Sequence, residues 1–348
     1  GLPHWCAWVE KMLEKKVITI NKNKINIDFS ELEKEINNSK ISNISKNYTP
    51  KNHKHNEKTE FTIIGVGDIM LGSNYPFEYL LPENDANILE NTQNILKNAD
   101  ITVGNLEGTL FDTGGTPKSC NNPNVCYVFR MPLRYGTYLK QAEFDYLSIA
   151  NNHSNDFGEI GIKETMKNLD NLGIKYSGIK DIAESAILEK DGKKFGFISF
   201  SPNSATVKLN DYNYAKKLIS ELKSKVDIVI VMFHGGAEGA SAEHITKRHE
   251  IFHGEDRGNV YEFAHFAIDN GADIIFGQGP HVTRAIELYK NKFISYSGGN
   301  FATFGKINVS GSMGIAPIFK IKINNKGDFI SGEIIPVRQT YRSFGPFI

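Results

Sequence analysis

From Phe61 onward, short apolar runs alternate with stretches whose apolar residues recur every three or four positions. The runs are rich in Val, Ile and Phe and almost continuous, which is typical of strands covered on both faces. The periodic stretches predict amphipathic helices, and the alternation of the two predicts an α/β architecture. The predicted helices span residues 85–99, 132–143, 158–173, 210–225 and 257–271.

The last part of the chain breaks this rhythm. Residues 285–289, 292–298, 316–323 and 328–337 predict strands without intervening helices. The turn sequence Asn324-Asn-Lys-Gly327 indicates a hairpin between the last two of these strands. We therefore expect mixed sheets with an antiparallel C-terminal part.

The first 60 residues have a different composition, rich in Lys, Asn, Glu and Ser. Residues 43–58 contain almost no apolar side chain, which indicates a solvated linker. His53 and His55 lie in it, and a solvated tail is favoured there over a surface metal contact. We expect an N-terminal segment with a polar linker at 1–60, one folded domain at 61–340 and a C-terminal tail at 341–348.

Residues of the types that bind metals fall just beyond the ends of predicted strands. These residues are Asp68, Glu107, Asn152 with its neighbour His153, His234 and His281. Each one alone is more typical of a turn or a cap. Open α/β sheets bind ligands beyond the carboxyl ends of their strands, so we expect these side chains to converge. Two carboxylates, an amide and three imidazoles together indicate a divalent-metal site.

Charge and cysteine content narrow the possible functions. The 40 basic and 40 acidic residues give no net charge, which does not favour a nucleic-acid-binding role. No apolar run approaches the roughly 20 residues that cross a bilayer, and the first residues lack the features of a signal peptide. Cys120 and Cys126 bracket a short Asn/Pro-rich loop, where a disulfide is favoured over free thiols. A disulfide favours an exported protein, and the sequence assigns no partner to Cys6.

Six short motifs occur together and in a fixed order. They are Gly-Asp-Ile-Met-Leu (67–71), Asn-Leu-Glu-Gly (105–108), Ala-Asn-Asn-His (150–153), His-Gly-Gly (234–236), Gly-Gln-Gly-Pro-His-Val (277–282) and Tyr-Ser-Gly-Gly-Asn-Phe (296–301). As a set they resemble the CapA family of bacterial capsule, or poly-γ-glutamate, synthesis proteins, within the calcineurin-like metallophosphoesterase superfamily. The resemblance runs from about residue 61 to residue 339.

The resemblance implies a four-layer αββα sandwich with two mixed sheets and a dimetal centre. The implied metal ligands are Asp68, Glu107, Asn152, His234, His281 and Gln278, with Glu107 bridging the ions and His153 and Asn152 serving catalysis. Manganese, zinc, iron and magnesium are all possible ions. Two positions depart from the superfamily pattern. Met70 and Gln278 each occupy a position at which the superfamily usually has a histidine.

Three further residues are candidates for binding substrate. Arg284 could clamp an anionic oxygen, Asn300 lies in the Gly-Gly-Asn turn of the last motif, and Glu238 is the one closest to His234 along the chain. A solvated Arg and a turn Asn are equally compatible with the sequence. Residues 237–258 form a long polar insertion that we expect to act as a mobile rim. Its His244, His249 and His253 are alternative ligands.

The resemblance implies a metal-dependent hydrolase of the phosphoesterase type in capsule synthesis. The alternative is a capsule-assembly component that binds an anionic polymer without catalysis. In either case we expect an anionic phosphoester or a polymer like poly-γ-glutamate as ligand, membrane proteins of capsule synthesis as partners, and a location outside the cell or in its envelope.

Overall fold

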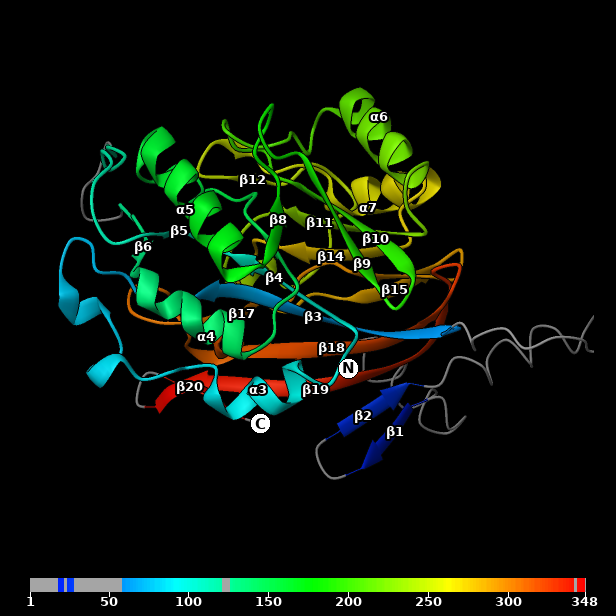
Figure 1. The fold of residues 1–348 in the computed structure, drawn as a ribbon, viewed down its shortest axis with the longest axis horizontal. Coiled ribbons are helices and arrows are strands. Elements are labelled where there is room, and N and C mark those ends of the chain that lie inside the picture. The colour runs from blue at the N-terminus through cyan, green and yellow to red at the C-terminus, as the bar shows by residue number, and fades with distance from the viewer. Residues whose placement is uncertain (1–17, 22–23, 28–57, 121–125, 341–342, 348) are drawn as a thin grey trace, which may run out of the picture.

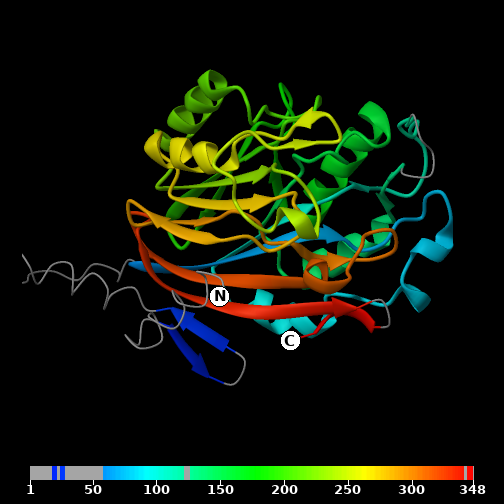
Figure 2. The same cartoon turned by 180° about the vertical axis from the view of Figure 1, so that it is seen from behind.

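Two mixed β-sheets pack face to face, and helices cover their outer surfaces (Figures 1 and 2). The computed structural model describes residues 18–21, 24–27, 58–120, 126–340 and 343–347. The arrangement is the four-layer αββα sandwich that the sequence led us to expect.

The larger sheet contains both parallel and antiparallel strands. Its strands are β1 (Ile18–Asn21), β2 (Lys24–Ile27), β3 (Glu60–Met70), β4 (Ile101–Leu106), β7 (Tyr146–Ser148), β8 (Lys175–Ser177), β17 (Asn300–Thr303), β18 (Ile315–Asn324), β19 (Phe329–Thr340) and β20 (Ser343–Phe347). Strands β3, β4, β7 and β8 are parallel, and β17 pairs in parallel with β3. Strands β18 and β19 form the predicted antiparallel hairpin, and β2 and β20 both pair with β19.

The smaller sheet is also mixed. It comprises β9 (Ser185–Lys190), β10 (Lys193–Phe200), β11 (Ile228–His234), β14 (Ile274–Gln278), β15 (Ile286–Tyr289) and β16 (Lys292–Ser295). Its four central strands are parallel, while β9 and β15 pair antiparallel at the two edges. Two short strand pairs lie outside the sheets: β5 (Thr109–Leu110) with β6 (Arg130–Met131), and β12 (Ile251–Phe252) with β13 (Glu255–Asp256).

Four of the five predicted helices form near their expected positions. They are α4 (Gly136–Gln141), α5 (Gly158–Leu172), α6 (Tyr212–Lys223) and α7 (Val260–Asp269). The side chains of Asp211 and Asn259 cap α6 and α7 by accepting backbone N–H bonds, and α5 ends at Gly173 in the left-handed conformation.

The helix predicted at 85–99 is largely absent. Only α3 (Gln93–Leu96) is α-helical there, preceded by single 3-10 turns at Glu83–Asp85 and Glu90–Thr92. Asn84 and Asp85 take positive φ angles, and the Asn87 side chain accepts the backbone N–H of Leu89. Such local side-chain bonds compete with helix formation, so the apolar spacing alone was a poor guide.

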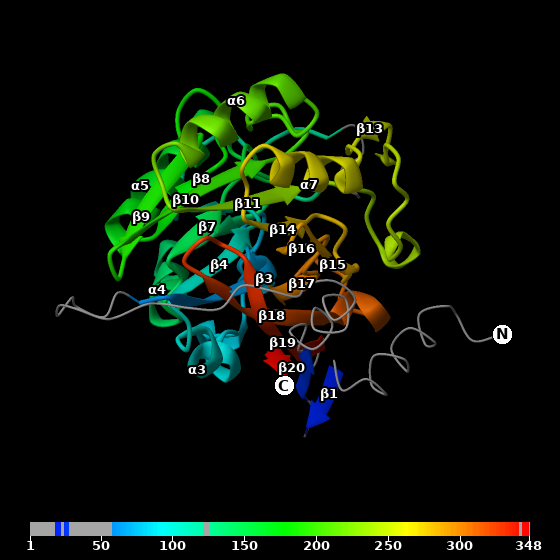
Figure 3. The same cartoon turned by 90° about the vertical axis from the view of Figure 1, so that its right-hand side faces the viewer.

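Three hydrophobic cores separate the four layers. Along β3, Phe61 and Ile63 face the smaller sheet, whereas Ile64 and Val66 face the outer core that α4 and α5 complete. A third core lies between the smaller sheet and the helices α6 and α7, which Figure 3 shows on one side of β10 and β11. Because each central strand buries both faces, its apolar residues run almost without interruption.

The loop between β5 and β6 is closed by a disulfide. Cys120 and Cys126 are bonded with their Cα atoms 5.6 Å apart, which confirms the pairing favoured from the sequence. Cys6, His53 and His55 lie outside the described residues. Among the described residues, no helix is both long and apolar enough to cross a membrane.

The core between the sheets should dominate stability. Phe276 on β14 is 1% exposed, and a Cβ atom at Gly65 on the facing strand β3 would lie only 2.2 Å from its ring. We expect Phe276→Ala to lower the free energy of unfolding by about 3–5 kcal/mol, measured by urea denaturation. The control Phe77→Ala, at a side chain that is 55% exposed, should change it by no more than about 0.5 kcal/mol. Equal losses for the two variants would contradict this packing.

Candidate metal centre

The carboxyl ends of parallel strands from both sheets meet at one edge of the sandwich. Asp68 lies near the end of β3 and Glu107 directly follows β4 in the larger sheet. His234 and Gln278 end β11 and β14 in the smaller sheet, where they are register partners. The sequence prediction that these strand ends converge is reflected in this arrangement.

Close backbone contact at Gly67 fixes the position of Asp68. A Cβ atom on Gly67 would lie 1.9 Å from the carbonyl oxygen of Gly299, so no larger residue fits. The Asp68 backbone N–H donates to that same carbonyl oxygen over 2.8 Å. Asn300 pairs in register with Asp68, which brings the Ser-Gly-Gly-Asn motif against β3.

Asp68, Glu107 and His281 form the centre of the site. Each offers one ligand atom, and these atoms all lie within 4.8 Å of one another. The His281 Nδ1 atom lies 3.1 Å from Asp68 Oδ2 and 3.0 Å from Asn300 Oδ1, so its N–H donates to these oxygens. Its Nε2 atom faces two more carboxylates, 3.5 Å from Glu107 Oε1 and 3.8 Å from Glu238 Oε2.

This geometry requires a proton or a cation between His281 Nε2 and the carboxylates. With the proton on Nδ1, the Nε2 lone pair points at carboxylate oxygens, which is repulsive unless a proton or a cation lies between them. Burial lowers the pKa of His281, but the charge of Glu107 and the hydrogen bond to Asp68 outweigh it and raise the pKa to about 10. The protonated imidazole thus takes the place that a cation would fill.

Glu107 is the most strongly perturbed acid of the site. Its side chain is fully buried, and neither oxygen has a hydrogen-bond partner among the described residues. Burial raises the pKa of Glu107 well above its usual range, and the nearby charges of Asp68 and Glu238 add to this. A buried carboxylate without a donor is costly unless a cation is bound to it.

Three further residues carry buried ligand atoms without partners among the described residues: His234, Asn152 and Gln278. Neither ring nitrogen of His234 has a hydrogen-bond partner in the described part of the chain, and the same holds for Asn152 Oδ1 and Gln278 Oε1. The Gln278 amide nitrogen donates to the Val66 carbonyl, which leaves its oxygen free for another contact. Burial lowers the pKa of His234 well below its usual range, helped by the charge of Arg257, so its imidazole is neutral. A neutral imidazole and amide oxygens are competent metal ligands, and the residues present therefore fit divalent cations.

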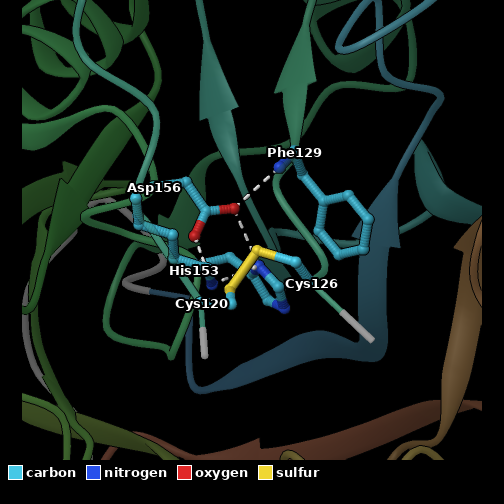
Figure 4. The surroundings of a disulfide bond; sticks show 6 residues. Cys120, Cys126, Phe129, His153 and Asp156 are labelled. Carbon is cyan, nitrogen blue, oxygen red and sulfur yellow. Dashed lines mark hydrogen bonds and ion pairs between the residues drawn. A yellow bond between two sulfur atoms is a disulfide. The ribbon is translucent and has the colours of Figure 1, made fainter. Parts of the chain in front are cut away.

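His153 is held in one orientation by Asp156. The His153 Nδ1 atom lies 2.8 Å from Asp156 Oδ2, and that oxygen also accepts the backbone N–H of Phe129 over 2.7 Å (Figure 4). The Lys118 ammonium lies 2.6 Å from the other Asp156 oxygen, and the Phe129 ring packs 4.2 Å from the imidazole. Burial lowers the pKa of His153, although the charge of Asp156 opposes this. No described residue hydrogen-bonds to Nε2, so this atom is available for proton transfer.

The three candidate substrate residues have different positions. Asn300 is buried; its oxygen accepts from His281, and its amide nitrogen donates to the carbonyls of His281, Asn308 and Met313, so it orients the imidazole. Glu238 lies between His281 and Arg257, with its Oε1 atom 3.0 Å from Arg257 Nη1.

Arg284 lies outside the cluster. Its guanidinium makes two bonds to Glu250, of 3.0 and 2.8 Å, and donates to the carbonyls of Ala242 and Ala237. These bonds fasten the 237–258 insertion to the domain. In the same insertion His249 pairs with Asp256, and the three-residue cluster includes none of His244, His249 and His253.

Sequence reasoning missed Asp156, Lys118 and Arg257. The spacing His153-x-x-Asp156 was a usable signal, because a turn can bring together two side chains that are three residues apart. Lys118 and Arg257 reach Asp156 and Glu238 from distant parts of the chain, and no local pattern marks them.

A four-layer sandwich of two mixed sheets thus carries a buried carboxylate–imidazole cluster between the strand ends of its sheets. Residues 62–304 match the family model described as "Bacterial capsule synthesis protein PGA_cap". The chain belongs to this family.

Curated relatives support the same assignment. The chain is 29% identical over 252 residues to the PGA biosynthesis protein CapA of Bacillus subtilis (strain 168), covering 68% of this chain and 61% of that protein. It is 28% identical over 273 residues to the capsule biosynthesis protein CapA of Bacillus anthracis, covering 72% of this chain and 61% of that one. The chain thus spans 61% of the length of these two relatives.

Among solved structures, the chain is similar to a hypothetical protein from Thermus thermophilus. The TM-score is 0.49 at 16% identity, with 80% of this chain and 100% of that chain covered.

The position of Arg284 leads to a stability test. We expect Arg284→Met to lower the free energy of unfolding by about 3–5 kcal/mol in urea, because it leaves the Glu250 carboxylate buried without its partner. The double variant Glu250→Leu with Arg284→Met should recover most of that loss. An unchanged stability combined with weaker binding of inorganic phosphate would instead assign Arg284 to the substrate.

Proposed function

We propose that this protein is a metal-dependent hydrolase of the phosphoesterase type that acts in bacterial capsule synthesis. Membership of the capsule-synthesis family supports the biological setting. The observation that carries the activity is the set of buried ligand atoms without partners, on Glu107, His234, Asn152 and Gln278. Such atoms are rarely left unpaired in a site that binds nothing.

The proposed ligands fall into two groups. Asp68, Glu107 and His281, whose ligand atoms lie within 4.8 Å of one another, would hold one divalent ion, and Glu107 would also serve the second. His234, Asn152 and Gln278 would complete the second site. Oxygen and amide ligands suit manganese or magnesium, while the imidazoles suit zinc or iron, so the donor set accepts any of these four.

The residues of this chain divide the work of hydrolysis. Bound divalent ions would polarise phosphoryl oxygens and lower the pKa of a water molecule. Asp156 accepts the Nδ1–H of His153 and its charge favours the imidazolium form, which also carries a proton on Nε2. In that form His153 would donate the Nε2 proton to the departing oxygen as a general acid. Asn300 fixes the ring of His281, and Arg257 keeps the carboxylate of Glu238 in place at the edge of the cluster.

A second candidate is a polymer-binding component without catalysis. Met70 favours it, because its side chain is buried in the outer hydrophobic core and supplies no ligand where the superfamily usually has a histidine. Gln278 favours it as well, since an amide oxygen is a weaker ligand than imidazole for zinc or iron. In either role the proposed ligand is an anionic phosphoester or a polymer like poly-γ-glutamate.

The same proposal includes a location and partners. The disulfide between Cys120 and Cys126 supports an oxidising compartment outside the cell or in its envelope. Membrane proteins of capsule synthesis are the proposed partners, and the zero net charge does not favour nucleic acid.

Hydrolysis of chromogenic phosphate esters tests the activity. We expect manganese-dependent cleavage of p-nitrophenyl phosphate or its bis-ester, and a loss of about a hundredfold or more in kcat for His153→Ala, because the general acid is removed. Asp156→Asn should also lower kcat, since Nδ1 loses its carboxylate partner. The control His244→Ala, an exposed side chain in the 237–258 insertion, should keep full activity. Absence of turnover with every ester and metal would favour the non-catalytic role.

A further inference from the structure

A cavity opens beside the proposed catalytic residues. It has a volume of about 500 Å³, and its walls include Asn152, which is a proposed metal ligand, and Lys118, which contacts Asp156. A second cavity of about 490 Å³ shares Lys208 with the first and continues toward the start of α6. His153 lies in the chain between two residues that line the first cavity, Asn152 and Ser154.

The charged side chains of the first cavity are paired, with one exception. The Lys118 ammonium lies 2.6 Å from a carboxylate oxygen of the buried Asp156, which neutralises its charge. Elsewhere in the lining, Glu255 pairs with Arg257, which also pairs with Glu238, and Asp256 pairs with His249. Among the described residues, no carboxylate lies within ion-pair distance of the fourth charged residue, Lys208. Lys208 is therefore the one charged side chain of the lining without an ion-pair partner among the described residues, although the two lysines and two carboxylates of the lining balance in formal charge.

Lys208 is held in place by neutral groups. Its ammonium donates to the carbonyl oxygens of Pro202 and Asn203, over 2.8 and 2.6 Å. An ammonium has three donors, so one N–H remains for a further acceptor. Burial lowers the pKa of Lys208, and the neighbouring charge of Lys180 adds to this, against a smaller opposing effect of Glu255. A bound anion would offset that cost.

The rest of the wall is rich in amides and hydroxyls. Asn151, Asn155 and Asn203 contribute amide groups, and Ser204 and Thr206 contribute hydroxyls. Such groups both donate and accept hydrogen bonds, which suits a chain of amide units or hydroxyl groups better than an apolar one.

We propose that this cavity is the subsite for the leaving-group side of the substrate, and that Lys208 binds an oxyanion on a polar chain there. The chain is of the amide or polyol class, and the oxyanion is a carboxylate or a phosphate. This inference rests on the proposed hydrolase, because the metal centre fixes which end of the substrate reacts. The position of the subsite beside His153, which protonates the leaving oxygen, gives the cavity its role.

Binding of small anionic chains tests the subsite without requiring turnover. The probes are triglutamate, its neutral counterpart triglutamine, and glycerol 3-phosphate, titrated by calorimetry into protein reconstituted with manganese and into protein treated with a chelator. We expect Lys208→Gln to weaken binding of at least one anionic probe about tenfold, the effect of losing one charge-assisted hydrogen bond. Which of the two anionic probes binds more tightly distinguishes the carboxylate from the phosphate.

Three control variants sharpen this test. Lys208→Arg keeps the charge and should retain most of the affinity. Asn155→Asp adds a negative charge to the wall without touching the bonds of Lys208, and should weaken anion binding as well. Lys97→Gln removes an exposed lysine that lines neither cavity and should leave binding unchanged. Thermal unfolding checks that each variant is folded.

The outcomes separate this inference from the proposed activity. Equal binding of both anionic probes by wild type and Lys208→Gln, or no binding of either anion, would overturn the subsite. Triglutamate that binds no more tightly than triglutamine, together with no binding of glycerol 3-phosphate, would do the same. Absence of metal and of turnover, with binding that still depends on Lys208, would instead overturn the hydrolase and leave an anion-binding cavity.

Discussion

The burial of Glu107 is the constraint on which the site depends. Its carboxylate lies at the junction of two sheets, and neither oxygen accepts a hydrogen bond from a described residue. Desolvating an ionised group is too costly to leave uncompensated, so either a proton or a cation must be present. The protonated His281 beside it meets this need within the chain, and a divalent ion held by Asp68, Glu107 and His281 would meet it better.

The fold brings these residues together by aligning two parallel sets of strands. Strands β3 and β4 of one sheet and β11 and β14 of the other end at the same edge of the sandwich. The phenylalanine-rich core between the two sheets keeps these strand ends next to one another. The close backbone contact between Gly67 and Gly299 then lets β3 pack directly against the segment that carries Asn300. The same strands therefore form the stabilising core along their length and carry the proposed site at their ends.

Much of this arrangement can be predicted from the sequence, because buried parallel strands leave long apolar runs and their ends mark the site. That Asp68, Glu107 and His281 come together was predictable from their positions after strands. The helix expected at 85–99 was wrong, because asparagine side chains compete with helical bonds there. The partners of His153 and Arg284 were not predictable, since Asp156 depends on a turn and Glu250 on the path of a long insertion.

The most direct test of the account is the metal content per chain, measured by mass spectrometry as purified and after reconstitution with manganese. The account predicts close to two ions per chain, as in dinuclear phosphoesterase sites. Asp68→Ala and His234→Ala should each lower that number, while His244→Ala should not. A chain that holds no divalent metal under either condition would contradict the account, because the buried Glu107 and His234 would then have no ligand to explain them.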